Sequence, residues 1–489
     1  MSAILYSVNK HKHTQEVTSG GDPKLSIKNN GDDIVGCDKI EVEDVWVVGI
    51  PKFLTESAFR LVDINKDGVL DVIMGFGTGA DGYDIPEVVC DIYFHGQSPC
   101  YGGVMALEGK TGKVLWKQFS KHELFGLNCN VDLNEDGVLD CLAGGRAGTF
   151  DAISGKDGDV LWRYGKTDLM NFYTPQFIAD IDGDKVSDIL QIHGGDPLQD
   201  PGSKYRLSGN IMLFSGKTGQ VIKTIGVPDK KESYYSPQIY SQKDGTQIVL
   251  FGTGGETHGG SLWRITLNHL IKGQIYKAKR IYTDNFKGVM TPPVLLDINK
   301  DEVVDIVISM FNSTVLAIDG RTFHVIWNYT FPSSETYCTP AAGYYNDDEV
   351  PDFLIKYQNG PGFPIYYSSE TTVLDGKTGQ PLISPSVKDS IGAQSSPLTI
   401  SVEGRGNDIF LFWVADCLGH VGQGGQYGFV KGTNVHEKSR SDNCRLRFKT
   451  KGFTELLAKS RHIKSRGVRI YYSGQIFFPL LFVFRYLPN

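Results

Sequence analysis

The chain has 489 residues, of which 57 are glycine and 11% are aromatic, and its formal net charge is −7. Glycine exceeds its usual share of roughly 7%, which indicates many turns, and the aromatic content is ample for a large core. The acidic balance gives no general attraction for nucleic acid, and the length fits either two or three domains or one closed ring of repeats.

The N-terminal segment, residues 1–38, is polar and rich in glycine and asparagine, so we expect it to be disordered. Its apolar stretch is too short for a secretory signal peptide. The following run, KIEVEDVWVV at 39–48, contains several β-branched residues. We expect this run to supply the strand that closes the ring of repeats described below.

The stretch LVDINKDGVLDVIMG, residues 61–75, joins a candidate calcium loop to an apolar strand. Oxygen-bearing side chains alternate along the loop, as a hard cation requires. An EF-hand is excluded, because Met74 replaces its bidentate glutamate and the flanking residues are typical of strands rather than helices. The expected ligands are Asp63, Asn65, Asp67, Asp71 and the carbonyl oxygen of Val69.

The same nonapeptide returns in near-complete form at 132–140, 180–188 and 297–305, so a chance acidic turn does not explain it. A fifth copy, YYNDDEVPD at 344–352, lacks the first aspartate. Lys185 and Glu302 replace the glycine that permits the sharp turn, which weakens the case for those two copies. The expected ligands are Asp132, Asn134, Asp136, Asp140 and the Val138 carbonyl; Asp180, Asp182, Asp184, Asp188 and the Val186 carbonyl; and Asp297, Asn299, Asp301, Asp305 and the Val303 carbonyl.

A second repeat interleaves with the first and predicts β-hairpins. Its five copies begin with MALEGKTGKVLW at 105–116 and end with TVLDGKTGQPLI at 372–383. Each is a strand, a tight turn built on glycine with aspartate or threonine, and a second strand. We expect the tryptophan that ends several copies to pack between neighbouring units. The two repeats together predict an all-β propeller of seven four-stranded blades over residues 39–430.

The segment 431–475 is basic, and we expect it to be partly ordered and to dock on the acidic ring rather than on nucleic acid or an anionic membrane. Within it, 453–464 is expected to form a short helix and 467–473 a strand. The apolar tail at 476–489 begins with nine apolar residues. That run is shorter than the stretch of about 20 that a membrane-spanning helix needs.

Two pairs of cysteines are close in sequence and predict disulfides. Cys90 and Cys100 bracket one short loop, and Cys129 and Cys141 flank the second candidate calcium loop. Neither pair has the CxxC spacing of a metal site, which favours disulfides. The sequence does not pair the other four cysteines, Cys37, Cys338, Cys417 and Cys444.

Two N-x-S/T sequons make Asn312 and Asn328 candidate glycosylation sites. Together with the calcium loops and disulfides they favour the secretory route. The glycine-rich run GTGGETHGG at 252–260 lacks the Lys-Ser/Thr pair and the helix of a phosphate loop. The run GFGTGADG at 75–82 likewise leads into a loop rather than a Rossmann helix.

The nonapeptide followed by an apolar strand resembles the FG-GAP repeats of integrin alpha-chain propellers, and the chain resembles still more the family with sequence similarity 234. This second resemblance rests on FRLVDINKDGVLDVIMGFGTGADGYD, GGVMALEGKTGKVLWK and LNCNVDLNEDGVLDCLAGGRAGTFDAISGKDGDVLW, and covers residues 40–470. It implies a single-pass type II membrane protein with a non-enzymatic propeller that is extracellular or lumenal. The anchoring helix of that family is not visible in this chain.

Two enzymatic alternatives stay open. The hairpin at 106–116 is similar to the tryptophan-docking repeat of quinoprotein dehydrogenases, which hold pyrroloquinoline quinone and calcium on the ring axis. Those enzymes usually have eight blades and a pair of adjacent cysteines, which this chain lacks. A polysaccharide-active propeller would need paired acidic residues in a central cleft, whereas calcium binding explains the repeated aspartates. We therefore expect no enzymatic activity.

The path of the chain around a blade places the calcium loop and the hairpin turn on one face, which we call the calcium-loop face. The long insertions at 76–103 and 193–209 then share the opposite face, which we call the insertion face. Long loops on a rigid scaffold commonly carry binding sites, although these could also simply cap the ring. We expect a protein partner to engage the aromatic residues of the insertions, a type enriched at interfaces: Tyr83, Tyr93, Phe94 and Tyr205.

Overall fold

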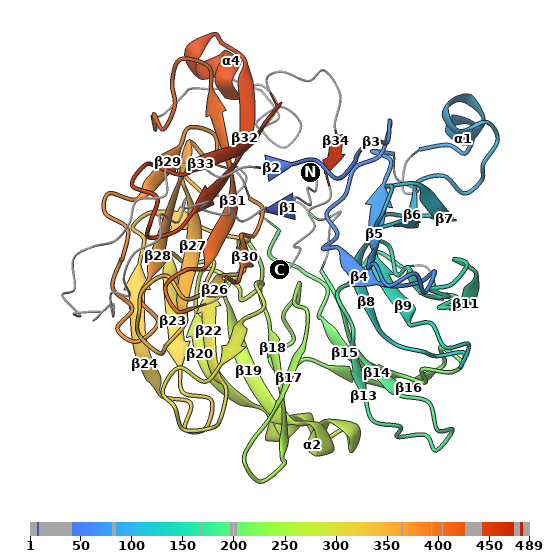
Figure 1. Ribbon diagram of the computed structural model, residues 1–489. Coiled ribbons are helices and arrows are strands. Elements are labelled where there is room, and N and C mark those ends of the chain that lie inside the picture. Colours follow the sequence, from blue (N-terminus) through green and yellow to red (C-terminus); the bar gives the residue numbers. More distant parts are fainter. Residues whose placement is uncertain are drawn as a thin grey trace, which may run out of the picture.

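The computed structural model is a seven-bladed β-propeller, with antiparallel sheets arranged around a central axis (Figure 1). It describes residues 7–8, 42–80, 85–166, 168–195, 199, 203–362, 365–392, 394–402, 404–425, 443–473 and 480–482. The predicted fold and number of blades are confirmed. Five of the blades have four strands, and the third and sixth have one short extra strand at the inner edge.

The first three blades follow the chain in order, with the innermost strand first. Blade 1 contains β4 (Arg60–Val62), β5 (Asp71–Gly77), β6 (Gly102–Leu107) and β7 (Val114–Ser120). Blade 2 contains β8 (Leu124–Val131), β9 (Asp140–Gly145), β10 (Phe150–Ile153) and β11 (Val160–Arg163). Blade 3 contains β12 (Asn171–Phe172), β13 (Gln176–Ile178), β14 (Asp188–Gly194), β15 (Asn210–Phe214) and β16 (Val221–Gly226).

The remaining four blades repeat the same order. Blade 4 contains β17 (Gln238–Ser241), β18 (Gln247–Gly252), β19 (Gly260–Thr266) and β20 (Lys279–Asp284), with the helices α2 (Leu267–Ile271) and η1 (Ile275–Lys277) between its last two strands. Blade 5 contains β21 (Val294–Leu296), β22 (Asp305–Ser309), β23 (Thr314–Ile318) and β24 (Val325–Thr330). Blade 6 contains β25 (Ser334–Glu335), β26 (Ala341–Gly343), β27 (Asp352–Asn359), β28 (Ser368–Leu374) and β29 (Val387–Asp389). Blade 7 contains β30 (Leu398–Ile400), β31 (Ile409–Cys417), β32 (Gly452–Lys459) and β33 (Val468–Tyr472).

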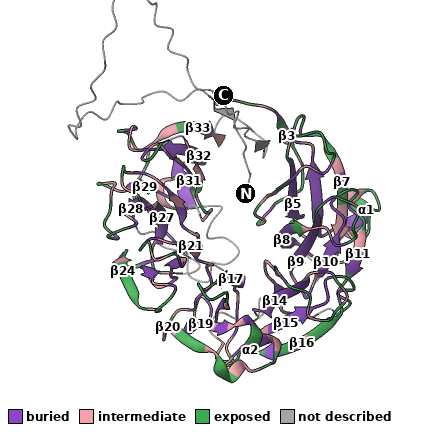
Figure 2. Ribbon diagram, turned by 60° about the horizontal axis from the view of Figure 1, so that its bottom comes forward, coloured by how far each residue is buried: buried purple, intermediate pink, exposed green. Residues whose placement is uncertain are grey.

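The core lies between neighbouring blades (Figure 2). Every residue of β5 and β14 is buried, because each of these strands is covered on both faces by adjacent sheets. This explains why β5 is an almost continuous apolar run without alternation after Asp71. Glycine lets the sheets approach closely: a Cβ at Gly75 would lie 2.1 Å from the carbonyl oxygen of Leu124 in the next blade.

Tryptophan side chains link successive blades, as the sequence predicts. In four of the six tryptophans the indole N–H donates to the carbonyl oxygen of a glycine in the next hairpin, and the ring lies against a second glycine of that hairpin. A Cβ at Gly158, for example, would lie 2.6 Å from the Trp116 ring. The indole-to-carbonyl distances are 2.8 Å for Trp116 to Gly155, Trp162 to Gly216 and Trp327 to Gly376, and 2.9 Å for Trp46 to Gly109.

Trp46 makes this contact with the hairpin of blade 1. The described part of the run 39–48, to which Trp46 belongs, adds no strand to a blade. The strand after Trp46, β3 (Val47–Gly49), pairs with β34 (Leu480–Phe482), and the strand before it, β2 (Val42–Glu43), pairs with β1 (Ser7–Val8). The expectation that residues 39–48 supply a blade strand is therefore wrong. Their contribution to the closure is the side chain of Trp46.

The boundary expected at residue 430 is also wrong, because β32 and β33 complete blade 7. The predicted helix at 453–464 is mostly the strand β32, which pairs with β31 on one side and β33 on the other. Pairing along two edges outweighs local helix propensity. The strand predicted at 467–473 is confirmed as β33.

The basic C-terminal residues contact acidic groups of the ring, as expected. Arg466 lies 2.9 Å from a carboxylate oxygen of Asp416, and Arg461 pairs with Asp347 of blade 6. The described part of the segment 431–475 is thus an integral part of the propeller rather than an appendage.

We predict that Trp46→Ala lowers the free energy of unfolding by about 3 kcal/mol, because it leaves a cavity against the blade 1 hairpin. Trp46→Phe keeps an aromatic ring but loses the hydrogen bond to Gly109, so a loss of about 1 kcal/mol is expected. Urea denaturation of the two variants measures both values. Wild-type stability for Trp46→Ala would show that this contact does not hold the ring closed.

Candidate functional site

The first candidate calcium loop, between β4 and β5, is curled by hydrogen bonds from its own backbone to its own side chains. The Asp63 carboxylate accepts from the amides of Asp67 at 3.0 Å and Gly68 at 2.9 Å. The Asp67 carboxylate accepts from the Val69 amide at 2.9 Å. These bonds gather the expected ligands into one turn, and the same pattern recurs at 132–140 and 297–305.

The two copies without glycine at the turn have the same backbone conformation as the others. Lys185 has φ of 74° and Glu302 has φ of 69°, close to the 83° of Gly68. A non-glycine residue in this region costs roughly 1–2 kcal/mol, and the hydrogen bonds of the loop offset that cost. The missing glycine is therefore no geometric objection to these two loops.

The aspartate at the ninth loop position has a role that the sequence analysis missed. Asp71 is fully buried, and its Oδ2 accepts from the amides of Ile64 at 3.0 Å and Asn65 at 3.4 Å. Its Oδ1 accepts from the amide of Gly109, in the hairpin between β6 and β7, at 2.8 Å. The carboxylate thus ties the loop to the hairpin, and we call this arrangement the clamp.

Five blades contain this clamp, including the copy that lacks the first aspartate. The carboxylates and their hairpin glycines are Asp71 with Gly109, Asp140 with Gly155, Asp188 with Gly216, Asp305 with Gly320, and Asp352 with Gly376. The sequence held one signal for it: the copy at 344–352 keeps its ninth residue after losing its first. A residue needed only as a cation ligand has no reason to persist in such a copy.

The clamp also confirms that the candidate calcium loops and the hairpins share one face. In three blades a basic hairpin residue neutralises the aspartate at the fifth loop position. The nitrogen-to-oxygen distances are 2.9 Å for Lys110 to Asp67, 4.0 Å for Lys156 to Asp136, and 3.1 Å for Arg321 to Asp301. The hydrogen bond from Lys110 is the main cause that lowers the pKa of Asp67.

The blade 3 loop fits a divalent cation best. Its side-chain ligands would all be carboxylates, and Asp184 accepts a hydrogen bond from the hydroxyl of Ser215, at 3.4 Å, rather than from a basic hairpin residue. Oxygens of Asp180, Asp182 and Asp188 lie within 4.8 Å of one another, the one such group of three among the described residues. Hydrogen bonds from the amides of Gly183 and Lys185 lower the pKa of Asp180.

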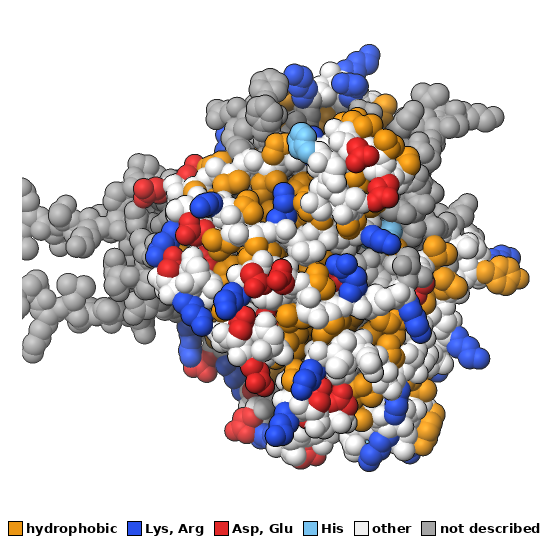
Figure 3. Space-filling view, turned by 90° about the vertical axis from the view of Figure 1, so that its right-hand side faces the viewer, with side chains coloured by type: hydrophobic (Ala, Val, Ile, Leu, Met, Phe, Trp, Pro, Cys, Tyr) orange, Lys and Arg blue, Asp and Glu red, His pale blue; other side chains and the backbone are white. Residues whose placement is uncertain are grey.

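The insertion of blade 1 forms the helix α1 (Val88–Phe94) on the insertion face. Ile92 and Tyr93 are 63% and 52% exposed, whereas Phe94 packs against Phe53 and Phe119 with ring centroids 6.3 and 6.2 Å apart. Phe94 therefore fixes the helix to the blade instead of facing a partner. On the side of the ring shown in Figure 3, hydrophobic side chains are interspersed among charges of both signs.

Of the other residues expected to bind a partner, Tyr205 in the blade 3 insertion is 86% exposed. Tyr83 lies outside the described residues.

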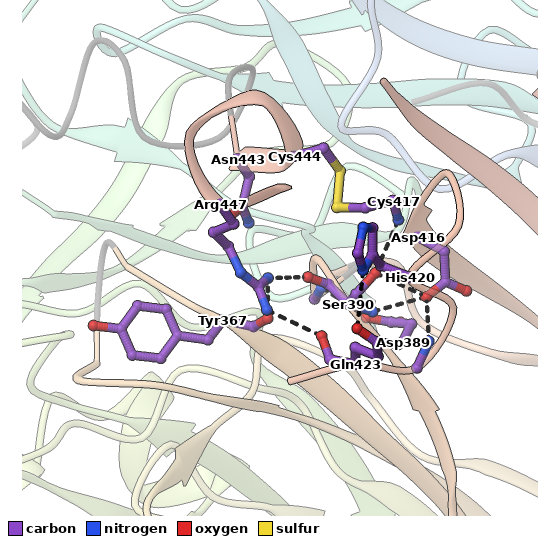
Figure 4. Close-up of a disulfide and its surroundings, with 12 residues drawn as sticks. Tyr367, Asp389, Ser390, Asp416, Cys417, His420, Gln423, Asn443, Cys444 and Arg447 are labelled. Carbon is purple, nitrogen blue, oxygen red and sulfur yellow. Dashed lines mark hydrogen bonds between the residues drawn. A yellow bond between two sulfur atoms is a disulfide. The ribbon is translucent and has the colours of Figure 1, made fainter. Parts of the chain in front are cut away.

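Both predicted disulfides are present: Cys90–Cys100 fixes the blade 1 insertion, and Cys129–Cys141 spans the second candidate calcium loop. A third, Cys417–Cys444, joins β31 to the helix α4 (Asn443–Phe448) (Figure 4). This helix belongs to the connection between β31 and β32, which we call the blade 7 insertion. The sequence did not reveal it, because the partners are 27 residues apart without a recognisable motif. Cys338 is a buried free thiol, and Cys37 lies outside the described residues.

Polar contacts brace the blade 7 insertion around this disulfide (Figure 4). Arg447 donates to the carbonyl oxygens of Tyr367 and Ser390, and to that of Gln423 at 3.0 Å. The buried carboxylate of Asp416 accepts from the amide of Ser390 at 2.9 Å. The insertion face thus carries at least two disulfide-braced insertions, in blades 1 and 7, which are neighbours across the ring closure.

The two sequons occupy different environments. Asn328 is exposed on β24, the outermost strand of blade 5. Asn312 lies at the turn between β22 and β23, where its amide nitrogen donates to the hydroxyl of Tyr282 and, at 2.7 Å, to the carboxylate of Asp284.

Comparison with known proteins identifies the family. The model of the FAM234A/B β-propeller matches residues 46–418, which is most of the ring. The chain belongs to this family. It is 26% identical over 381 residues to Protein FAM234B of Mus musculus, a match that covers 73% of this chain and 56% of the relative. It is 23% identical over 414 residues to Protein FAM234A of Mus musculus, covering 78% of this chain and 67% of the relative.

The match between this chain and FAM234B of Mus musculus spans 56% of the length of FAM234B. The chain is also similar to solved structures at low identity. Sqt1 of Saccharomyces cerevisiae matches with a TM-score of 0.44 and 10% identity over 75% of this chain and 95% of its own. The quinohemoprotein alcohol dehydrogenase ADHIIG of Pseudomonas putida matches with a TM-score of 0.40 and 9% identity over 76% and 72%. These likenesses carry no argument about function.

Within the described residues, none of the helices has the length and apolarity to cross a bilayer.

We predict that the clamp stabilises this FAM234-family propeller without calcium. Asp71→Asn turns one acceptor oxygen into a donor that faces backbone N–H groups, so we expect a loss of about 2–4 kcal/mol in the free energy of unfolding. The control Asp67→Asn changes an exposed residue of the same loop and should cost at most about 0.5 kcal/mol. Urea denaturation in EGTA compares them, and equal losses would contradict the clamp.

Proposed function

We propose that this chain is a non-enzymatic scaffold, extracellular or lumenal, that binds calcium for stability and a protein partner through its insertion face. The observation that supports the proposal most strongly is the asymmetry of the ring. On the calcium-loop face, clamps hold each of five loops to the hairpin of its own blade. The insertion face instead carries disulfide-braced insertions with exposed apolar side chains. A rigid ring that displays such loops on one side is suited to binding a macromolecule.

The enzymatic alternatives find less support. The relatives carry family names that denote no reaction. A quinoprotein would be expected to have adjacent cysteines and eight blades, while this chain has no adjacent cysteines and seven blades. A polysaccharide-active site would need acidic residues in the central cleft, whereas the repeated aspartates lie in loops at one face and are engaged in turns and clamps.

Disulfides support placement in the secretory route, because they persist in oxidising compartments. By family resemblance the propeller would stand outside the cytosol, attached to a membrane. The proposed partner is a protein and not a nucleic acid, because the basic residues Arg461 and Arg466 near the C-terminus are paired with carboxylates of the ring.

The calcium proposal predicts a response that is centred on blade 3. At millimolar calcium, a site with Kd near 10⁻⁴ M adds about 1.4 kcal/mol by mass action. Calcium should therefore raise the melting temperature relative to EGTA, and Asp184→Ala should remove most of the rise. Asp67→Ala is the matched control, because Lys110 already neutralises that position. A melting temperature that is the same in calcium and EGTA would refute calcium binding.

The partner proposal predicts that α1 is needed for capture. Ile92→Ser combined with Tyr93→Ser removes two exposed side chains without touching the core, so the ring should keep its wild-type melting temperature. Proteins enriched on the wild-type ring should fall at least about tenfold on this variant, which corresponds to 1.4 kcal/mol or more of binding energy. Quantitative mass spectrometry of a pull-down measures the ratio.

The matched control is Tyr276→Ser, in η1 on the calcium-loop face, where the side chain is 74% exposed. If Tyr276→Ser abolishes capture while the variant Ile92→Ser with Tyr93→Ser retains it, the partner binds the calcium-loop face and the proposal is wrong.

A further inference from the structure

A cavity of about 410 Å³ with polar and apolar lining lies on the insertion face, between the connections of blades 4, 5 and 6. Its walls come from the turn after β20, the turn between β22 and β23, the segment that leads into β25, and the end of β27 with residues 360–362. We propose that this cavity binds a neutral, hydroxyl-rich ligand, namely a saccharide. The inference is independent of calcium and of the protein partner.

One wall of the cavity is held rigidly by the glycine-rich run at 252–260. The amide of Gly288 donates to the carbonyl oxygen of Gly255 at 2.8 Å, and the amide of Val289 donates to that of Thr253 at 2.9 Å. The two backbones are so close that a Cβ at Gly288 would lie 2.2 Å from the carbonyl carbon of Gly254. The glycines of this run thus have a structural purpose: they position the turn at 284–288.

That turn presents an aromatic ring at the rim of the cavity. The amides of Phe286 and Lys287 both donate to Oδ1 of Asp284 at 2.7 Å, which fixes the turn, while the side chain of Phe286 is 78% exposed. An exposed ring on a fixed turn beside polar groups offers a surface for the apolar C–H face of a pyranose. Ligand sites commonly combine such a ring with a few convergent polar groups.

The wall contains one lysine and two carboxylates, and protein groups engage all three, which disfavours an anionic ligand. Lys287 lies 2.5 Å from a carboxylate oxygen of Glu335 and donates to the carbonyl oxygen of Glu256 at 2.8 Å. The hydroxyl of Tyr366 donates to the other oxygen of Glu335, also at 2.8 Å. Asp284 accepts the two amides of its own turn and the side-chain nitrogen of Asn312.

The side-chain amide of Asn312 ties the turn at 284–288 to the neighbouring wall. Its nitrogen donates to the hydroxyl of Tyr282 and, at 2.7 Å, to the carboxylate of Asp284. Its Oδ1 is buried and has no hydrogen-bond partner among the described residues, so this side chain positions the wall rather than facing a ligand. Asn312 also belongs to a sequon, and a glycan on its nitrogen would break one of those two bonds and fill the cavity.

The proposal is tested by saturation-transfer NMR and calorimetry of the intact chain with three probes: maltotriose, cellotriose and the trimer of N-acetylglucosamine. At least one should bind, and Phe286→Ala should weaken that binding about tenfold or more, or about 1.4 kcal/mol. Tyr276→Ala, at an exposed aromatic on the opposite face, should leave binding unchanged, and both variants should melt like the wild type.

Four results would overturn the proposal. The first is no binding of any probe at millimolar concentration. The second is binding that survives Phe286→Ala. The third is binding of choline at this cavity in place of the saccharides, which would show a cation site. The fourth is a glycan on Asn312 in glycopeptide mapping, since the cavity would then be filled by the chain's own modification.

Discussion

A fully buried aspartate carboxylate accepts backbone N–H groups from its own loop and from the neighbouring hairpin in five of the seven blades. Burying a carboxylate is costly unless hydrogen bonds satisfy it, and here three amides do so. Because two strand connections share one carboxylate, neither can move without leaving amides unpaired. The shape of the calcium-loop face follows from this interaction.

The clamp also contributes to how the blades meet. The hairpin glycine that donates to Asp71 is Gly109, and the carbonyl oxygen of the same residue accepts the indole of Trp46. In the same way, the amides of Gly155, Gly216 and Gly376 donate to clamp carboxylates, and their carbonyl oxygens accept from the tryptophans of the preceding blades. The disulfide-braced insertions of blades 1 and 7 and the cavity between blades 4, 5 and 6 lie on the opposite face.

Sequence reasoning recovered what depends on local patterns. The repeats specify a seven-bladed ring, and cysteines ten and twelve residues apart gave the two short disulfides. Features that depend on distant partners escaped it: β32 is a strand because β31 and β33 flank it, and Cys417–Cys444 spans a long insertion. The clamp escaped it because an acidic residue in a calcium-type loop looks like a ligand, and only its burial and three amide donors reveal this second role.

The central claim is that these carboxylates, rather than a bound cation, hold each loop to its hairpin. Amide hydrogen exchange in EGTA tests it most directly at the hairpin glycines Gly109, Gly155, Gly216, Gly320 and Gly376. Our account predicts that these amides exchange as slowly as those of the central strands β5 and β14, with or without calcium. Fast exchange in EGTA that becomes slow only when calcium is added would contradict it.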